Sequence, residues 1–209
     1  MAASLKLTYL GHSCFKIECS KGSLVCDPYD ETLGYKKLKL KSNIVTKSHE
    51  HGDHNFLKCV DVAPIDDAGF NLVEVKTFHD AEGGAKRGEN TAYIFESEGL
   101  RVCHLGDLGH ILTHEQVDEI GKIDALLVPV GGTYTITGTE AAEVTAQLRP
   151  NLVIPMHYKT DVSTLNISDE REFLKNLAGS YMIRYCPKNT FVLSKDSERG
   201  AYILSYSRS

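Results

Sequence analysis

The stretch Ser48-His49-Glu50-His51-Gly52-Asp53-His54 sets three histidines and one aspartate at short, fixed offsets. It follows the apolar residues 44–46, which we predict to form a short buried strand, so the stretch itself is expected to be a loop at the end of that strand. Neutral imidazole and carboxylate groups are the donors that zinc, iron and manganese accept in proteins. The pattern therefore predicts a metal site in this loop.

The spacing within the stretch indicates how the donors divide. His49 and His51 are two residues apart, so in an extended backbone they project to the same side and can hold one ion. Asp53 and His54 follow a glycine that lets the chain turn, and they can hold a second ion. Asp53 can also hydrogen-bond a water on the metal, so we expect it to be the catalytic group that orients this water and takes a proton.

Four donors do not complete a site for two metals, so others must come from distant parts of the chain. His79, Asp107 and His157 share one context, because each follows a short apolar segment that we predict to be a strand. The carboxyl ends of strands are where folds of alternating strands and helices place their sites. These three residues are therefore the candidates for the remaining ligands.

The rest of the chain indicates an α+β fold with two sheets and helices outside them. Alternating or continuously apolar segments predict strands at 5–10, 15–19, 23–26, 72–78, 91–95, 101–105, 125–130 and 152–154. Helices are expected at 114–120, from 139 onward with Thr139 as a candidate N-cap, and at 169–177. Segments 191–193 and 201–204 are expected to form a closing hairpin. No linker or repeat divides the chain, so we expect one domain over residues 1–209.

The composition narrows the class of protein. The 209 residues carry a formal net charge of -5, which argues against broad electrostatic binding of nucleic acid. No apolar run approaches the roughly 20 residues of a membrane span, and the N-terminus lacks the apolar region of a signal peptide. Six cysteines without a C-x-x-C pair read as reduced core thiols. We therefore expect a cytoplasmic protein with no membrane span.

Short motifs outside the first stretch carry a family resemblance. They are Gly11-His12-Ser13, Leu105-Gly106-Asp107, Pro129-Val130-Gly131-Gly132 and Met156-His157-Tyr158. With the histidine-rich stretch, they make the chain resemble the metallo-β-lactamase superfamily. Within it the chain is similar to the small stand-alone hydrolases, a branch near L-ascorbate-6-phosphate lactonase and N-acyl-phosphatidylethanolamine phospholipase D. One departure is Ser48, where the family usually has threonine.

The resemblance implies an αββα four-layer sandwich with two mixed sheets and helices on the outer faces. It also implies two divalent metal ions, zinc first, with manganese or iron as alternatives. The first ion would take His49, His51 and His79, and the second would take Asp53, His54 and His157. Asp107 would bridge the two ions.

The function implied is hydrolysis of a small-molecule ester, lactone or phosphodiester by a hydroxide that bridges the metals. His12 and Tyr158 are candidates for contact with the substrate. A basic loop at 83–88, with Lys86 and Arg87, could close over an anionic substrate or could simply be solvated, and the sequence does not decide between the two. The sequence equally leaves open whether Asp27 orients a ligand histidine.

Two other readings compete with the hydrolase. An iron enzyme that resembles sulfur dioxygenases, with one iron on similar ligands, is the main alternative. A binding module on the same fold would lack ligands, whereas all seven are present. The sequence leaves a homo-oligomer open.

Overall fold

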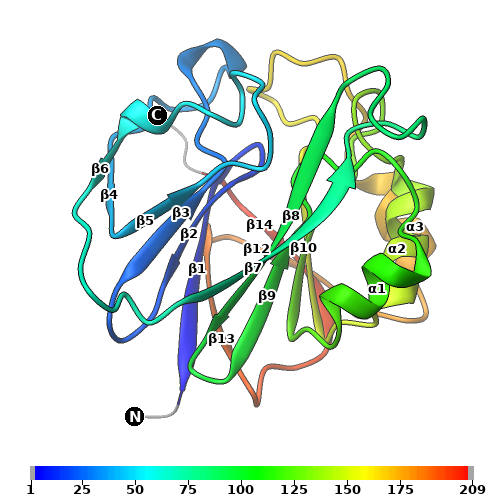
Figure 1. Ribbon diagram of the computed structural model, residues 1–209. Helices are drawn as coiled ribbons and strands as arrows, with labels where there is room; N and C mark the ends of the chain where they lie inside the picture. Colours follow the sequence, from blue (N-terminus) through cyan, green and yellow to red (C-terminus); the bar gives the residue numbers. More distant parts are fainter. Residues whose placement is uncertain (1–2, 207–209) are drawn as a thin grey trace.

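The computed structural model describes residues 3–206 and consists of two stacked β-sheets with helices on one side (Figure 1). The five-stranded sheet has the order β13-β1-β2-β3-β5, and the seven-stranded sheet has the order β12-β14-β11-β10-β9-β8-β7. The strands of the first sheet are β1 (Ser4–Gly11), β2 (Cys14–Glu18), β3 (Ser23–Cys26), β5 (Ile44–Thr46) and β13 (Thr190–Ser194). Those of the second are β7 (Asn71–Phe78), β8 (Glu89–Ser97), β9 (Leu100–His104), β10 (Ala125–Pro129), β11 (Leu152–Met156), β12 (Ile183–Cys186) and β14 (Gly200–Leu204). Each sheet contains parallel and antiparallel pairs, as expected.

Side-chain alternation explains why the sheets stack. In β1, Leu5, Leu7 and Tyr9 enter the core between the sheets, where they meet Leu127 of β10 and Ile154 of β11. Successive residues of a strand point to opposite faces, so the intervening side chains of β10 and β11 enter a second core beneath the helices. Strands buried on both faces are typical of a sheet that is covered on both sides.

The α-helices all cover the outer face of the seven-stranded sheet (Figure 1). They are α1 (His114–Ile120), α2 (Gly138–Leu148) and α3 (Arg171–Leu177). The prediction of Thr139 as the N-cap of α2 was wrong by two residues. Thr137 is the cap, because its hydroxyl accepts from the backbone N–H of Glu140 while the Glu140 carboxylate accepts from the N–H of Thr137.

Within the described residues, the outer face of the five-stranded sheet is covered without α-helices. Two 3₁₀ helices, η1 (Glu31–Leu33) and η2 (Leu57–Cys59), and the strand pair β4 (Leu40–Ser42) and β6 (Val60–Val62) lie there. Tyr29, Leu33, Tyr35 and Leu38 pack against this face in a third core. The fourth layer of the expected sandwich is therefore irregular, since the segment carries scattered apolar anchors rather than a helical stripe.

The predicted closing hairpin was wrong, although both strands exist. β13 pairs with β1 in one sheet, whereas β14 lies between β11 and β12 in the other. All five residues of β14 are buried, so this strand needs a neighbour on each side. The residues between them cross from one sheet to the other.

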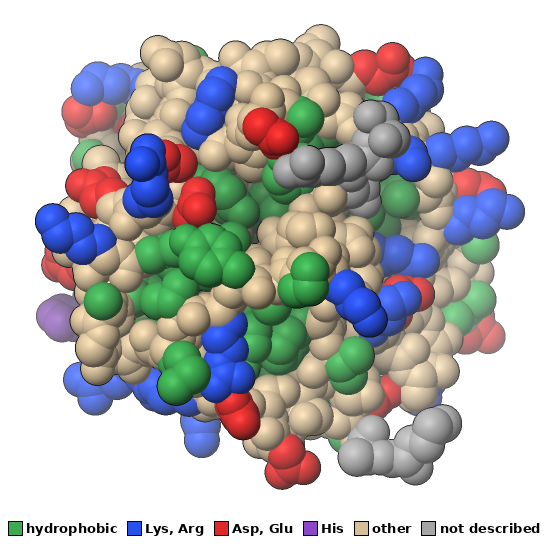
Figure 2. All heavy atoms as spheres, turned by 180° about the vertical axis from the view of Figure 1, so that it is seen from behind, with side chains coloured by type: hydrophobic (Ala, Val, Ile, Leu, Met, Phe, Trp, Pro, Cys, Tyr) green, Lys and Arg blue, Asp and Glu red, His purple; other side chains and the backbone are tan. Residues whose placement is uncertain are grey.

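Two edge strands lie near each other in the chain. The edge strand β12 exposes Tyr185, the edge strand β13 exposes Val192, and Met182 is exposed just before β12. Seen from behind, hydrophobic side chains reach the surface among Lys, Arg, Asp and Glu (Figure 2). A homo-oligomer through such surfaces stays a prediction.

Within residues 3–206, none of the helices has the length and apolar composition that crossing a bilayer needs.

Candidate metal centre

The predicted ligands meet at one end of the sandwich. His49 follows β5, His79 follows β7, Asp107 follows β9 and His157 follows β11, so four strand ends from both sheets deliver side chains to one point. The loop after β5 adds His51, Asp53 and His54. As expected from the strand pattern, residues far apart in the sequence are brought together here.

Asp107 is the centre of this cluster. Its Oδ2 lies 3.2 Å from the Nε2 atoms of both His54 and His157, 3.3 Å from that of His79 and 3.9 Å from that of His49. Around it are two donor groups, His49, His51 and His79 in one and His12, Asp53, His54 and His157 in the other. Within each group the donor atoms lie within 4.8 Å of one another.

Several of these donors are buried without a hydrogen-bond partner. Among residues 3–206, His49 Nε2 and Asp107 Oδ1 have none. A buried polar atom without a partner is costly, and so many donors facing one another are stabilised if a cation lies between them. Imidazole nitrogens with carboxylate oxygens are the donor set that zinc, manganese and iron accept. The residues present therefore fit divalent metal ions.

Burial and neighbouring charges set the ionisation of the donors. Burial alone would raise the pKa of Asp107, but His157 and His54 outweigh it and hold the pKa well below its usual range. Burial, helped by the neighbouring His54, lowers the pKa of His49 to about 3. A neutral His49 and an ionised Asp107 are the forms that bind a metal ion.

Asp27 and Ser48 orient two of the histidines. Asp27 Oδ2 accepts from His54 Nδ1 at 2.8 Å and from the Ser48 hydroxyl at 2.5 Å. Because that hydroxyl gives its proton to Asp27, it accepts from His49 Nδ1, 2.9 Å away. Both rings therefore donate from Nδ1 and direct Nε2 toward Asp107, where Nε2 can bind a cation. The orienting role that the sequence left open for Asp27 fits this geometry, and Ser48 keeps the hydroxyl of the usual threonine.

The turn that carries Asp107 is fixed by a residue that sequence reasoning missed. The Asn90 side chain donates to Leu105 O at 2.9 Å, and its Oδ1 accepts from the backbone N–H of Asp107 at 2.9 Å. Gly106 has φ +56°, and a Cβ there would lie 2.4 Å from both Ser48 Cβ and Asn90 Oδ1. Only glycine fits this close approach. Asn90 stands between Glu89 and Thr91 at the start of β8, so no local signal in the sequence singled it out.

Asp80 was also missed, although it directly follows His79. Its buried carboxylate accepts from four backbone N–H groups of the next loop, those of Glu82, Gly84, Lys86 and Arg87. Burial opposes ionisation, but these four bonds outweigh it and lower the pKa of Asp80 to about 2. The basic loop at 83–88 is thus folded around one carboxylate.

The two candidates for substrate contact lie in different places. His12 is fully buried and its Nε2 lies 3.1 Å from His54 Nε2, so it belongs to the second donor group rather than to an open surface. Tyr158 is 5% exposed and packs in the core beneath the helices. Its contact with a substrate stays a prediction.

A groove beside the first donor group provides access. It has a volume of about 500 Å³, and its lining includes His49, His51, Arg87 and Tyr93. His51 is exposed, and the Arg87 guanidinium donates to Thr133 O at 3.0 Å. In the described part of the chain no carboxylate pairs with Arg87, whereas Lys47 in the same groove is bound by Glu50 at 2.6 Å. The groove therefore offers one uncompensated cation.

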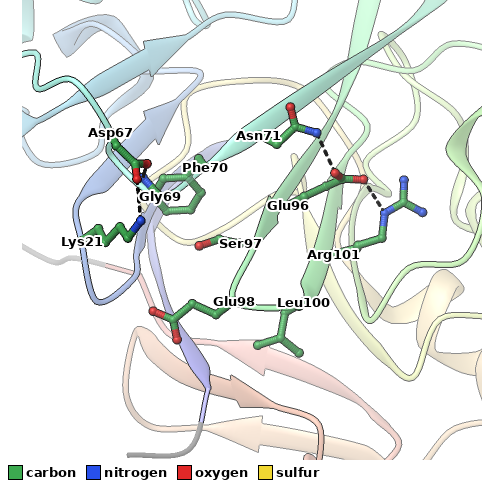
Figure 3. A pocket seen from close by; sticks show the side chains of 11 residues that line it. Lys21, Asp67, Gly69, Phe70, Asn71, Glu96, Ser97, Glu98, Leu100 and Arg101 are labelled. Atoms are coloured by element: carbon green, nitrogen blue, oxygen red, sulfur yellow. Dashed lines mark hydrogen bonds and ion pairs between the residues drawn. The ribbon is translucent and has the colours of Figure 1, made fainter.

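A second hollow lies at the other end of the sandwich (Figure 3), and we call it the distal hollow. Its volume is about 620 Å³, and it lies where β7 begins and β8 turns into β9. Lys21 pairs there with Asp67, and Glu96 accepts from Asn71 and Arg101. The Glu98 carboxylate accepts from the backbone N–H groups of Ser4 and Ser20. None of the predicted site residues lines it.

Two stacked mixed sheets with this donor cluster at their strand ends define a candidate metal-binding protein of the metallo-β-lactamase fold. Residues 6–157 match the family described as the beta-lactamase superfamily domain, and the chain belongs to that superfamily. It is 28% identical over 192 residues to a UPF0173 metal-dependent hydrolase from Thermococcus onnurineus, which covers 75% of this chain and 85% of the relative.

Solved structures agree with this assignment. A protein from Thermotoga maritima, named a Zn-dependent hydrolase of the metallo-beta-lactamase superfamily, is 38% identical with a TM-score of 0.77, covering 97% of this chain and all of that one. A protein from Parabacteroides distasonis, named a metal-dependent hydrolase, is 21% identical with a TM-score of 0.70 over 98% of this chain and 94% of its own, and supports the fold alone. The expected fold class is confirmed.

Proposed function

We propose that this chain hydrolyses a small anionic ester, lactone or phosphodiester with two divalent ions, zinc first. The observation that carries the proposal is the position of Asp107, whose Oδ2 lies within 3.9 Å of four histidine Nε2 atoms. One carboxylate between two groups of histidines is the arrangement that a pair of ions requires.

The residues divide between the two ions as the family resemblance implies. His49, His51 and His79 would hold the first ion, Asp53, His54 and His157 the second, and Asp107 would lie between them. Such ions lower the pKa of bound water and polarise the oxygen of a substrate. Asp27 and Ser48 support this set because they fix the tautomers of His54 and His49.

Asp53 is the proposed proton carrier. Its side chain is 27% exposed, unlike the buried Asp107, so solvent and substrate can reach it. Burial alone would raise its pKa, but the contact with His12 and the charge of His54 outweigh burial and hold that pKa below its usual range. Asp53 is therefore ionised at neutral pH and can accept a proton from water that it orients.

Arg87 supplies the preference for an anion. It lines the groove beside His49 and His51 and has no carboxylate partner among residues 3–206. The four backbone bonds to Asp80 hold the loop around it, so the guanidinium is positioned before a substrate binds. A guanidinium recognises carboxylate and phosphate oxygens in a bidentate manner.

We also propose that residues 1–209 form one domain. The core between the sheets takes side chains from β1 near one end of the described chain and from β14 near the other. A boundary inside the chain would divide this core.

Metal content and turnover test the function. Protein purified without added metal is expected to carry about two equivalents of zinc or manganese. It is expected to hydrolyse bis-p-nitrophenyl phosphate or a simple lactone, with loss of turnover in chelator. One equivalent of iron with oxygen uptake would favour the dioxygenase reading and contradict the proposal.

Arg87 and its neighbour Lys86 form a matched pair for testing the substrate class. Arg87→Gln is expected to raise KM for bis-p-nitrophenyl phosphate about 10-fold and to leave KM for an uncharged lactone unchanged. Lys86→Gln removes the same charge one residue away, where the ammonium pairs with Glu82 outside the groove, and it should change neither KM. Equal effects of the two variants would refute an anion site at Arg87.

A further inference from the structure

His12 is buried among the metal donors and does not line the groove through which a substrate would enter. It lies in the tight turn between β1 and β2, with φ +55°, and its side chain is fully buried. Its Nε2 lies 3.1 Å from His54 Nε2 and 3.4 Å from Asp53 Oδ2. The ring is therefore directed at the second donor group and away from the groove.

The backbone around His12 is anchored at three successive points. Leu10 O accepts from the Tyr29 hydroxyl, His12 O accepts from the Tyr9 hydroxyl, and Ser13 O accepts from His104 Nε2, at 2.8, 2.9 and 2.8 Å. His12 O also accepts from the backbone N–H of His157 at 2.9 Å. This last bond ties the turn of one sheet directly to a ligand of the other.

The distances match those between ligands of one ion. With metal–nitrogen bonds of about 2.0–2.1 Å, two donors on the same ion at ordinary coordination angles lie about 2.9–3.4 Å apart. His54 and His157 lie 3.2 Å from Asp107 Oδ2, and His12 lies 3.1 and 3.4 Å from His54 and Asp53. By this measure His12 is placed as closely as the ligands themselves.

We propose that His12 is an additional protein ligand of the second ion. The second position would then take its donors from five protein groups, namely His12, Asp53, His54, His157 and the shared Asp107. The first position has one donor fewer, and its ligand His51 is exposed at the groove. With more protein donors, the second ion would be the more tightly held, and the first position would be the one more open to water and substrate. This inference rests on the proposed pair of ions.

The competing explanation is a hydrogen bond between the two imidazoles. His54 Nδ1 donates to Asp27, so His54 Nε2 is free to accept, and His12 Nε2–H can donate to it. In that case His12 only steadies His54, and the second ion keeps its full set of ligands when the His12 imidazole is removed.

The test is titration of the metal-free full-length protein with Co²⁺, followed by calorimetry and visible absorption. The variants are His12→Asn, since asparagine tolerates the left-handed backbone, and His12→Gly, which relieves it. We expect the wild type to bind two ions in a tight and a weaker phase. Both variants should weaken the tight phase by at least about 100-fold and change its cobalt spectrum, leaving the weaker phase unchanged. This is more than the 10–100-fold loss typical of an outer partner.

Imidazole and a control variant keep the test falsifiable. Free imidazole is expected to restore the tight phase in His12→Gly, which a folding defect would not allow. His114→Gln, at an exposed histidine at the start of α1 that lies outside the donor groups, should keep both phases. Two phases of wild-type affinity in both His12 variants would overturn the role of His12 alone. A wild type that binds a single ion would overturn the pair of ions and this inference with it.

Discussion

The two ends of the β-sandwich each gather polar side chains, but in opposite ways. At the distal hollow, Lys21 and Asp67 are more than half exposed, and each charged group already has its partner. At the metal centre, Asp107 and His49 are buried, and atoms of both lack a partner in the described chain. The distal hollow has the larger volume, yet each of its charged side chains is already bonded within the protein. A site is indicated by donors that are held in place without being satisfied.

Removing the central carboxylate, that of Asp107, should have the largest effect, because it should abolish metal binding, the property that separates the metal centre from the distal hollow. Asp107→Asn replaces the group that lies between the two sets of histidines, so we expect both ions to be lost and kcat/KM to fall by at least about 10³-fold. Metal analysis and turnover of bis-p-nitrophenyl phosphate measure the two effects. Retention of two ions at wild-type turnover would mean that Asp107 is not the centre of the site.

Two glycines with positive φ, one crowded at the metal centre and one in open space, allow the stability cost of adding a Cβ to be compared. Gly106→Ala places a Cβ 2.4 Å from Ser48 and Asn90 at φ +56°, and should cost about 3 kcal/mol in the free energy of unfolding, with loss of metal. Gly83→Ala at φ +67° meets no atom within 4 Å and should cost only about 1 kcal/mol. Urea unfolding of both variants gives the two values. A similar cost for both would show that crowding at Gly106 is not what demands glycine.

In the metal-free protein, His49 and His12 of the metal centre should make the free energy of unfolding depend on pH. Burial lowers the pKa of His49 to about 3 and that of His12 to about 4, from the usual value of 6.5. Between pH 6.5 and 4.5 the unfolded chain therefore binds protons that the folded chain does not. The free energy of unfolding should fall with falling pH by about 1 kcal/mol per unit for each histidine.

The pKa of the neighbouring His54 is shifted in the opposite direction, and His54 affects stability in a different pH range. Burial works against protonation of His54, but Asp107 and Asp27 outweigh it and raise the His54 pKa, so its contribution is full below pH 6.5 and is lost above that value. Urea unfolding in chelator across pH 4.5–6.5 isolates His49 and His12. His12→Asn should reduce the slope by about half, and an unchanged slope would contradict the assignment.

The smallest effect is expected at the distal hollow. Glu96→Gln weakens its contacts with Asn71 and Arg101, and since the ion pair is partly exposed, the free energy of unfolding should change by less than about 1 kcal/mol. Metal content and turnover should equal those of the wild type. A loss of activity in this variant would mean that the distal hollow influences the metal centre, and would contradict the view that the two ends are independent.

The local pattern of the sequence carried much of the prediction. His49, His51 and His54 stand in one short stretch, and the strand ends before His79 and His157 are readable from apolar alternation. What could not be read was which strands become neighbours. β13 and β14 follow one another in the chain yet enter different sheets. His12 lies at the same end of one sheet as the loop that carries Asp53 and His54, and it meets His157 because the second sheet is stacked on the first.

The missed supporting residues have a similar cause. Asp80 acts through four backbone N–H groups, and Asn90 acts through a backbone carbonyl and an N–H, so neither leaves a side-chain motif in the sequence. The cap of α2 could have been found, since Thr137 and Glu140 stand three residues apart.

The place of β14 has a consequence for the order in which the protein is made. β11, which leads to His157, has β10 on one side, and its other neighbour is β14, residues 200–204. While the ribosome is still adding the residues in between, the strand that delivers this ligand has an open, apolar edge that another nascent chain could pair with. A metal ion captured early by residues 49–54 would thus be bound before β14 has completed the support of the strand that delivers His157.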